Sequence, residues 1–151
     1  MVINRDIVFI HGLHENGHSW ILWKVYFEHK GYTCHTPDYP YHSGNPSYLR
    51  KHPNPNLASL RFKDIVAHYS NFIDTLSNKQ PILIGHSMGG LVVQKLIAEK
   101  KGAMGICITS ASPKGVLSLK WSFVKSNIGT VNPLKGNSVF LGSKAWFHYA
   151  I

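Results

Sequence analysis

The sequence predicts an α/β fold in which a parallel sheet of about four strands has helices on both faces. Short apolar runs alternate with longer runs of helical spacing, which is typical of βαβ units. Most of the short runs are continuously apolar, as expected for parallel strands that are buried on both faces. The length of 151 residues fits one domain, and 44% hydrophobic residues are enough to build its core.

Four short runs are the predicted strands. Each is bounded by glycine, proline or polar residues, which commonly end a strand. The runs lie at residues 7–10, 32–36, 81–84 and 105–109. Because neighbouring parallel strands end at the same edge of a sheet, the loops that follow the first and third runs should lie together.

Three segments are the predicted helices. The first is capped by Ser19 and ends at Gly31, with large aromatic residues on one face. The second starts at about Ser59 and has apolar residues at helical spacing through Leu76. The third, residues 91–100, is apolar around most of its girth. Residues 37–56 contain five prolines and are predicted to be a long loop without a regular element.

The charge and the cysteines restrict the function classes. Lys and Arg total 16 against seven acidic residues, and residues 100–151 hold seven lysines and no acidic residue. These lysines are scattered singly, so no nucleic-acid partner is expected. No apolar run is long enough for stable membrane insertion or for a signal peptide. With Cys34 and Cys107 as the only cysteines, a reducing cytoplasm is the expected location.

The segment Gly85-His86-Ser87-Met88-Gly89 fits the G-x-S-x-G pattern of a nucleophile elbow. It follows a predicted strand and precedes a predicted helix, which is the context that the elbow requires. The two glycines remove side chains that would clash as strand and helix close on each other. Ser87 is therefore the candidate nucleophile, in a strained conformation above the sheet edge. An incidental serine in a glycine-rich turn is the alternative.

The residues after the first predicted strand, His11-Gly12-Leu13, are the second candidate feature. Acyl transfer through a serine needs two N–H donors for the developing oxyanion. The Met88 N–H, directly after the nucleophile, is one candidate donor, and the Leu13 N–H is the other. His11, Gly12, Gly85, His86 and Gly89 are supporting residues of these two motifs.

The histidines also raise two other interpretations. His11, His14 and His18 are spaced by three and four residues, but the stretch is a glycine-containing loop without a second ligand cluster, so no metal site is expected. An upstream histidine could act as a base for Ser87, and His14 is the best candidate, since His86 should point away from the serine side chain.

Together, HG after the first strand, PDYPYHSG after the second, GHSMGG after the third and TSASP after the fourth resemble the N-terminal half of an α/β-hydrolase. The resemblance is closest to small bacterial esterases, lipases and lysophospholipases, and it covers residues 6–113. It implies a hydrolase core at residues 1–113 and the start of a lid or cap, weakly structured, at residues 114–151. It also implies a serine hydrolase that acts on small-molecule carboxylic esters through an acyl-enzyme on Ser87, with no cofactor.

The chain departs from that family in its acid and its base. The family order is Ser, then Asp or Glu, then His. Downstream of Ser87 the sequence has only Glu99 and His148 for these roles, and neither is well placed. We therefore expect an incomplete core, truncated before the catalytic acid and histidine. The alternative function is a non-catalytic remnant or binding module, completed by an oligomer or a second polypeptide at the open edge of the sheet.

Overall fold

The computed structural model describes residues 6–116 and 138–150, and the chain divides into two compact units. The first unit comprises Met1–Ser43 and Arg61–Ala111. The second comprises Gly44–Leu60 and Ser112–Ile151. The first unit contains the sheet and every residue of the two motifs.

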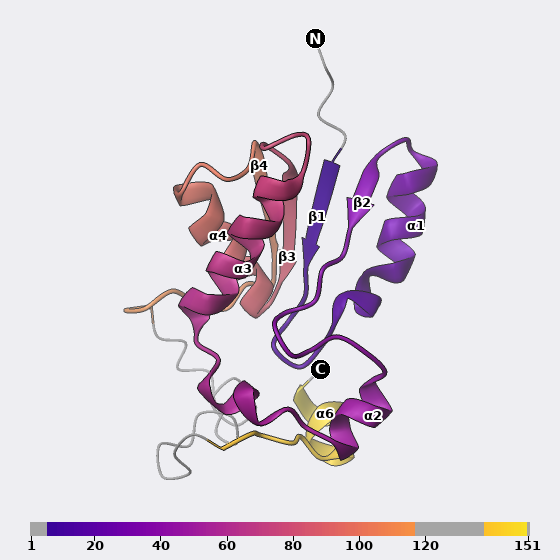
Figure 1. Ribbon diagram of the computed structural model, residues 1–151, viewed down its shortest axis with the longest axis vertical. Helices are drawn as coiled ribbons and strands as arrows, with labels where there is room; N and C mark the ends of the chain where they lie inside the picture. Colours follow the sequence, from indigo (N-terminus) through magenta and orange to yellow (C-terminus); the bar gives the residue numbers. More distant parts are fainter. Residues whose placement is uncertain (1–5, 117–137, 151) are drawn as a thin grey trace. The chain divides into compact units, whose positions relative to one another are not determined.

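The first unit is built on a four-stranded parallel sheet, as the sequence predicts (Figure 1). The strands are β1 (Asp6–Ile10), β2 (Thr33–His35), β3 (Ile82–His86) and β4 (Met104–Ile108), in the order β2-β1-β3-β4. In the register of β1 and β3, Ile10 lies opposite Gly85. The loops after these two central strands therefore leave the sheet side by side.

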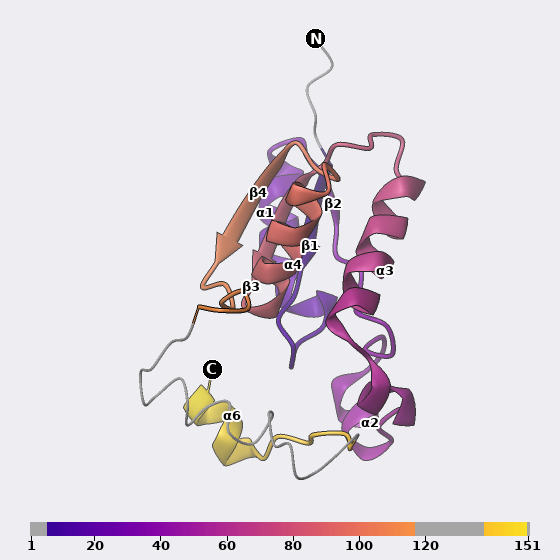
Figure 2. The ribbon, with the colours of Figure 1, turned by 90° about the vertical axis from the view of Figure 1, so that its left-hand side faces the viewer.

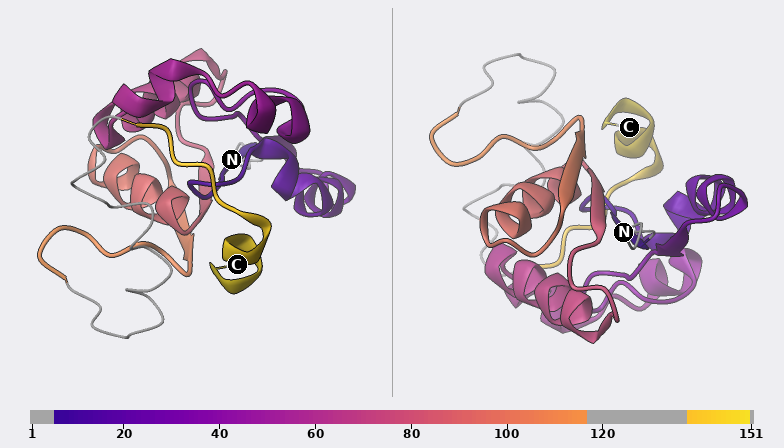
Figure 3. Two further views of the ribbon diagram at one scale, coloured as in Figure 1. Left: turned by 90° about the horizontal axis from the view of Figure 1, so that it is seen from below. Right: turned by 90° about the horizontal axis from the view of Figure 1, so that it is seen from above.

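Helices cover both faces of this sheet, which confirms the predicted fold class (Figures 2 and 3). The 3₁₀ turn η1 (Gly17–Trp20) and helix α1 (Ile21–His29) lie on one face, and α3 (Phe62–Thr75) and α4 (Met88–Ala98) lie on the other. The first helix is not capped by Ser19 as predicted, because the Asn16 side chain accepts the His18 N–H at the start of η1 instead.

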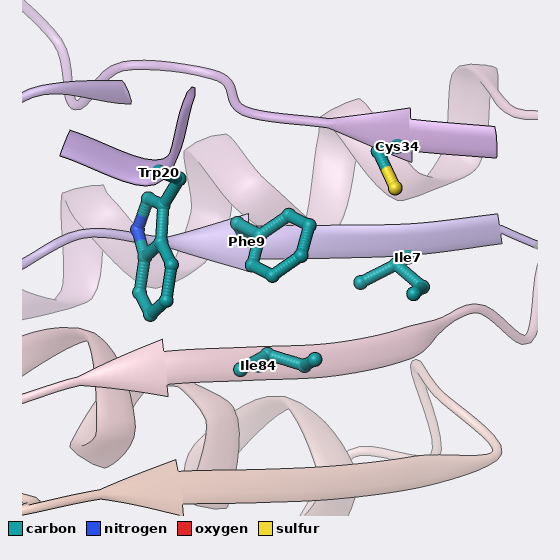
Figure 4. Close-up of a cluster of buried hydrophobic side chains, with 5 residues drawn as sticks. All are labelled: Ile7, Phe9, Trp20, Cys34 and Ile84. Carbon is teal, nitrogen blue, oxygen red and sulfur yellow. The ribbon is translucent and has the colours of Figure 1, made fainter. Parts of the chain in front are cut away.

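The core on the α1 face is a cluster of large apolar side chains (Figure 4). The rings of Phe9 and Trp20 lie 5.0 Å apart, and Phe27 of α1 packs against Phe9 from the other side at 6.1 Å. Full burial of a side chain such as Phe9 contributes roughly 2–3 kcal/mol to folding. The cluster holds η1 and α1 against β1. It therefore fixes both ends of the loop that connects β1 to η1.

The face covered by α3 and α4 holds the chain that follows β2. The Tyr69 hydroxyl of α3 donates to the Pro37 carbonyl at 2.7 Å, and His68 Nε2 donates to the Asp38 carbonyl at 2.9 Å. Burial raises the pKa of the Tyr69 phenol, so it stays protonated and can donate. These two bonds position Tyr39, the next residue along the chain.

The prediction of a loop without regular elements at residues 37–56 is wrong. The segment contains α2 (Pro46–Lys51) and the start of the 3₁₀ turn η2 (Pro55–Ser59), both in the second unit. In each case an asparagine side chain, Asn45 or Asn54, accepts backbone N–H groups at the start, and a proline occupies the first position. Asparagine caps and prolines at the first position favour helix starts, so here the same residues that suggested a loop begin short helices.

The second unit also contains α6 (Lys144–Ala150), a helix that the aperiodic sequence did not predict. Its first turn is capped by Ser143 Oγ, which accepts the Trp146 N–H at 3.1 Å. Arg50 of α2 donates to the Gly142 carbonyl at 2.8 Å, which joins the two helical segments of this unit. The domain boundary expected at residue 113 stays a prediction.

Candidate active site

Ser87 lies in a sharp turn between β3 and α4. Its backbone has φ 53° and ψ −118°, a conformation that a residue with a side chain rarely adopts. Such a conformation costs about 1–3 kcal/mol and persists only where the surroundings impose it. Here the Ser87 N–H donates to the Ile108 carbonyl at 3.0 Å, and the Ala111 N–H donates to the Ser87 carbonyl at 2.9 Å. The end of β4 and the loop after it therefore hold the serine in place.

Two glycines of the motif allow the turn to close. A Cβ on Gly85 would clash with the backbone carbonyl of Gly89, and a Cβ on Gly89 would clash with the carbonyl oxygens of Ile10 and His11. The first turn of α4 thus packs directly on the carboxyl end of β1. This contact brings the loop that begins at His11 against the turn that carries Ser87.

His11 is fully buried and anchors its loop through both ring nitrogens. Nδ1 donates to the Gly12 carbonyl at 2.7 Å, and Nε2 accepts the Tyr39 N–H at 3.0 Å. The Tyr39 hydroxyl in turn donates to the His11 carbonyl at 2.6 Å. Burial lowers the pKa of His11 to about 4, so the ring is neutral at neutral pH, as this pattern of one donor and one acceptor requires. His11 is therefore a structural residue of the loop.

The two candidate oxyanion donors follow the central strands β1 and β3. Leu13 is 37% exposed and lies in the turn closed by the Glu15 N–H and the Gly12 carbonyl. Met88 is the first residue of α4, where backbone N–H groups have no acceptor within the helix. Among the residues that the structure describes, neither the Leu13 N–H nor the Met88 N–H has a protein acceptor. Both remain available to an anionic oxygen.

The base and the acid are not supplied by the neighbours of Ser87. Within the described part of the chain, no side chain is hydrogen bonded to the Ser87 hydroxyl. His86 faces Glu15 instead, with Nδ1 3.2 Å from Oε1. Glu99 lies at the far end of α4, paired with Lys95 at 3.0 Å. His148 belongs to α6 in the second unit.

The loop histidines form no metal site among residues 6–116 and 138–150, where no group of three or more His, Cys, Asp or Glu side chains is arranged to hold an ion. Both nitrogens of His11 already have protein partners. Partial burial lowers the pKa of His14.

Sequence reasoning missed three contributors to this geometry. Tyr39 lies in the proline-rich stretch that was predicted to be a loop, and it holds the His11 ring through its N–H and its hydroxyl. Glu15 was not singled out, although its carboxylate accepts the Gly12 N–H at 3.1 Å. For Ala111, whose N–H donates to the Ser87 carbonyl, the sequence gives no indication of this role beyond its place after β4. Only the position of Glu15, three residues after Gly12, could have suggested its role, since that spacing closes a turn.

The comparisons with known proteins agree with the fold. The family model of the alpha/beta hydrolase fold matches residues 7–131. The chain belongs to the α/β-hydrolase fold family. No curated protein matches it.

Several solved α/β-hydrolases have a similar fold. An extracellular alpha/beta-hydrolase from a Paenibacillus species is 24% identical with a TM-score of 0.57, over 72% of this chain and 41% of that one. Tomato methylketone synthase I is 21% identical with a TM-score of 0.56, over 85% of this chain and 47% of that one. A methylesterase from Arabidopsis is 19% identical with a TM-score of 0.57, over 72% of this chain and 44% of that one. The chain therefore spans less than half the length of these relatives.

Proposed function

We propose that this chain is the nucleophile-bearing part of a serine hydrolase that acts on small-molecule carboxylic esters through an acyl-enzyme on Ser87. One observation supports this proposal above all. The strained Ser87 turn packs on the loop of Leu13, and the Leu13 and Met88 N–H groups have no protein acceptor among the described residues. A serine with two free amide donors beside it is the arrangement that stabilises a tetrahedral oxyanion. One structural neighbour is itself a methylesterase.

The reaction places each described group in a distinct role. Ser87 Oγ forms a bond to the ester carbonyl carbon while its proton passes to an imidazole base from outside the described neighbours of Ser87. The carbonyl oxygen becomes an oxyanion that accepts the Leu13 and Met88 N–H groups. Collapse of the tetrahedral intermediate breaks the bond to the alcohol, which leaves with a proton. Water then hydrolyses the acyl-enzyme and restores the Ser87 hydroxyl.

A fluorophosphonate probe tests this proposal directly. The probe phosphonylates an activated serine and mimics the tetrahedral intermediate. Because the described neighbours of Ser87 supply no base, we expect slow labelling of the folded chain that is lost in Ser87→Ala and retained in Ser112→Ala, a serine on the loop after β4. Mass spectrometry locates the adduct. A folded chain that takes up no probe at Ser87 would contradict stand-alone hydrolase chemistry.

A second candidate function is a binding module completed by another polypeptide, and the exposure of β4 favours it. Met104 and Ile106 of this edge strand are 55% and 43% exposed, although both are large and apolar. An edge strand of this kind offers free backbone groups and an apolar face to a pairing strand. Sedimentation analysis of the purified chain distinguishes the two functions: a stable monomer without partners argues against completion at β4.

The proposal also covers the cap segment, the partners and the cellular compartment. We propose that residues 114–151 begin a lid or cap segment and that the chain has no nucleic-acid partner. No helix in the described ranges 6–116 and 138–150 is long and apolar enough to cross a membrane. Cys34 and Cys107 are both free, which is compatible with a reducing cytoplasm. The similar Paenibacillus protein is extracellular, so the cytoplasmic location proposed for this chain does not follow from the hydrolase function.

A further inference from the structure

We propose that Glu15 is a positioning residue that joins the loop of Leu13 to the turn of Ser87. This inference deepens the proposed hydrolase function and rests on it for its catalytic meaning. Three groups from different segments meet at one carboxylate. The Gly12 N–H donates to Oε2 at 3.1 Å, Ser19 Oγ donates to Oε2 at 3.3 Å, and His86 Nδ1 lies 3.2 Å from Oε1.

The position of Glu15 in the chain explains why one side chain can reach all three groups. Its own N–H donates to the Gly12 carbonyl at 3.2 Å, so residues 12–15 form a closed turn after β1. Ser19 lies on the following 3₁₀ turn, which Trp20 anchors in the core. The carboxylate is thus held from its own loop and from η1, and it extends toward the strand that ends at His86.

The contacts of the Glu15 carboxylate with Gly12 and His86, here called the bridge, determine which backbone N–H can donate to an anionic oxygen. Gly12 and Leu13 are adjacent, and either N–H could serve as the donor of the loop. The carboxylate occupies the Gly12 N–H, while the Leu13 N–H has no acceptor among the described residues. Without Glu15, the Gly12 N–H would lose its acceptor and the turn could rotate. The predicted donor Leu13 therefore depends on a neighbour that does not itself touch the reacting atoms.

The bridge also sets the distance between the two halves of the site. His86 immediately precedes Ser87, so the close contact between His86 Nδ1 and Glu15 Oε1 at 3.2 Å joins the nucleophile turn to the loop of the oxyanion donor. The space between them is narrow, because a Cβ on Gly12 would lie 3.3 Å from both the Glu15 Cδ and the His86 Nδ1. The Gly12 N–H donates to the same carboxylate, and a hydrogen bond with an ionised acceptor is about twice as strong as a neutral one. A carboxylate is therefore well suited to hold this contact.

Three variants of the full chain test the proposal: Glu15→Ala, Glu15→Gln and, as a matched control, Glu99→Gln at the exposed end of α4. Amide hydrogen exchange at Gly12 and the rate of fluorophosphonate labelling at Ser87 are the two readouts. Loss of one hydrogen bond to a charged group corresponds to about a tenfold to hundredfold change. For Glu15→Ala we expect Gly12 exchange to rise and labelling to fall by about that factor. Exchange in β1 and β3 should stay unchanged.

Glu15→Gln keeps an acceptor for the Gly12 N–H but loses the carboxylate, so it should fall between the wild type and Glu15→Ala. Because it preserves the shape of the side chain, it decides the question even if Glu15→Ala fails to fold. Unchanged Gly12 exchange together with unchanged labelling in the Glu15 variants would overturn the proposal. If the wild type takes up no probe while Gly12 exchange still rises in Glu15→Ala, the bridge stands and the hydrolase function fails.

Discussion

Acidification should destabilise the first unit through His11. The ring accepts the Tyr39 N–H at Nε2 and donates to the Gly12 carbonyl at Nδ1. The Nε2 lone pair that would take a second proton is therefore already used in a hydrogen bond. Protonation would place a second N–H against the Tyr39 N–H and would charge a fully buried ring. His42 adds a further unfavourable charge nearby, while Asp38 and Glu15 act in the opposite direction.

The size of this effect follows from linkage. The pKa of His11 is about 4 in the folded chain against 6.5 for a free histidine. The unfolded state therefore binds more protons between these values, and stability present above the unfolded pKa is lost as the pH falls toward about 4. Between about pH 7 and about pH 5 the expected loss in the free energy of unfolding is about 2 kcal/mol. The full shift corresponds to about 3 kcal/mol.

Urea denaturation at the two pH values measures this loss, with His11→Gln as the test variant and His18→Gln, an exposed histidine of η1, as the control. His11→Gln should be less stable than the wild type at about pH 7, and its own pH dependence should be smaller by about 2 kcal/mol. His14 has a pKa that burial also lowers, so part of the acid sensitivity persists in both variants. An equal pH dependence in the wild type and in His11→Gln would refute the assignment.

Three further predictions follow from the turn and from the edge strand. Ser87→Gly should raise the free energy of unfolding by about 1 kcal/mol, because glycine adopts a positive φ without strain. A lower free energy of unfolding in urea denaturation would contradict that reasoning. Gly89→Ala should destabilise the chain by about 3 kcal/mol or more, because its methyl group would clash with the Ile10 carbonyl; near-native thermal unfolding would count against this packing. Ile106→Lys should abolish any self-association seen by sedimentation, and an oligomer of unchanged size would show that β4 is not its interface.

The parts of the fold that could be predicted are those whose signal is local. An apolar run such as Ile7–Ile10 is buried whichever neighbours it receives, so its strand state can be read from its residues. The same holds for the G-x-S-x-G segment, where the glycines and the flanking elements together require a sharp turn at Ser87. The sequence pattern alone predicted the parallel sheet and the edge at which both motifs meet.

The parts that could not be predicted depend on contacts between distant residues. Tyr39 lies in a proline-rich stretch, and its partnership with His11 arises only when β2 and α3 have placed it beside the end of β1. The contact between His86 and Glu15 has the same origin, because it joins the end of β3 to the loop after β1. Such pairs of distant residues leave no periodic pattern in the sequence. Asparagine before proline was ambiguous for another reason, since these residues serve loops and helix starts alike.

The position of β4 constrains where an acid and a base from outside the described neighbours of Ser87 could approach it. All described strands are parallel, so their carboxyl ends meet at one edge, and Ser87 is bonded there to Ile108 and Ala111 at the end of β4. A further parallel strand paired with β4 would lie about 10 Å from β3, at two strand spacings, and would end at the same edge. By the family order of Ser, then acid, then His, the loop after such a strand would carry the acid, and the histidine would follow a later strand. In the proposed completion, a strand paired with β4 would cover the exposed Met104 and Ile106 and would end beside Ser87, whose hydroxyl has no side-chain partner among the described residues.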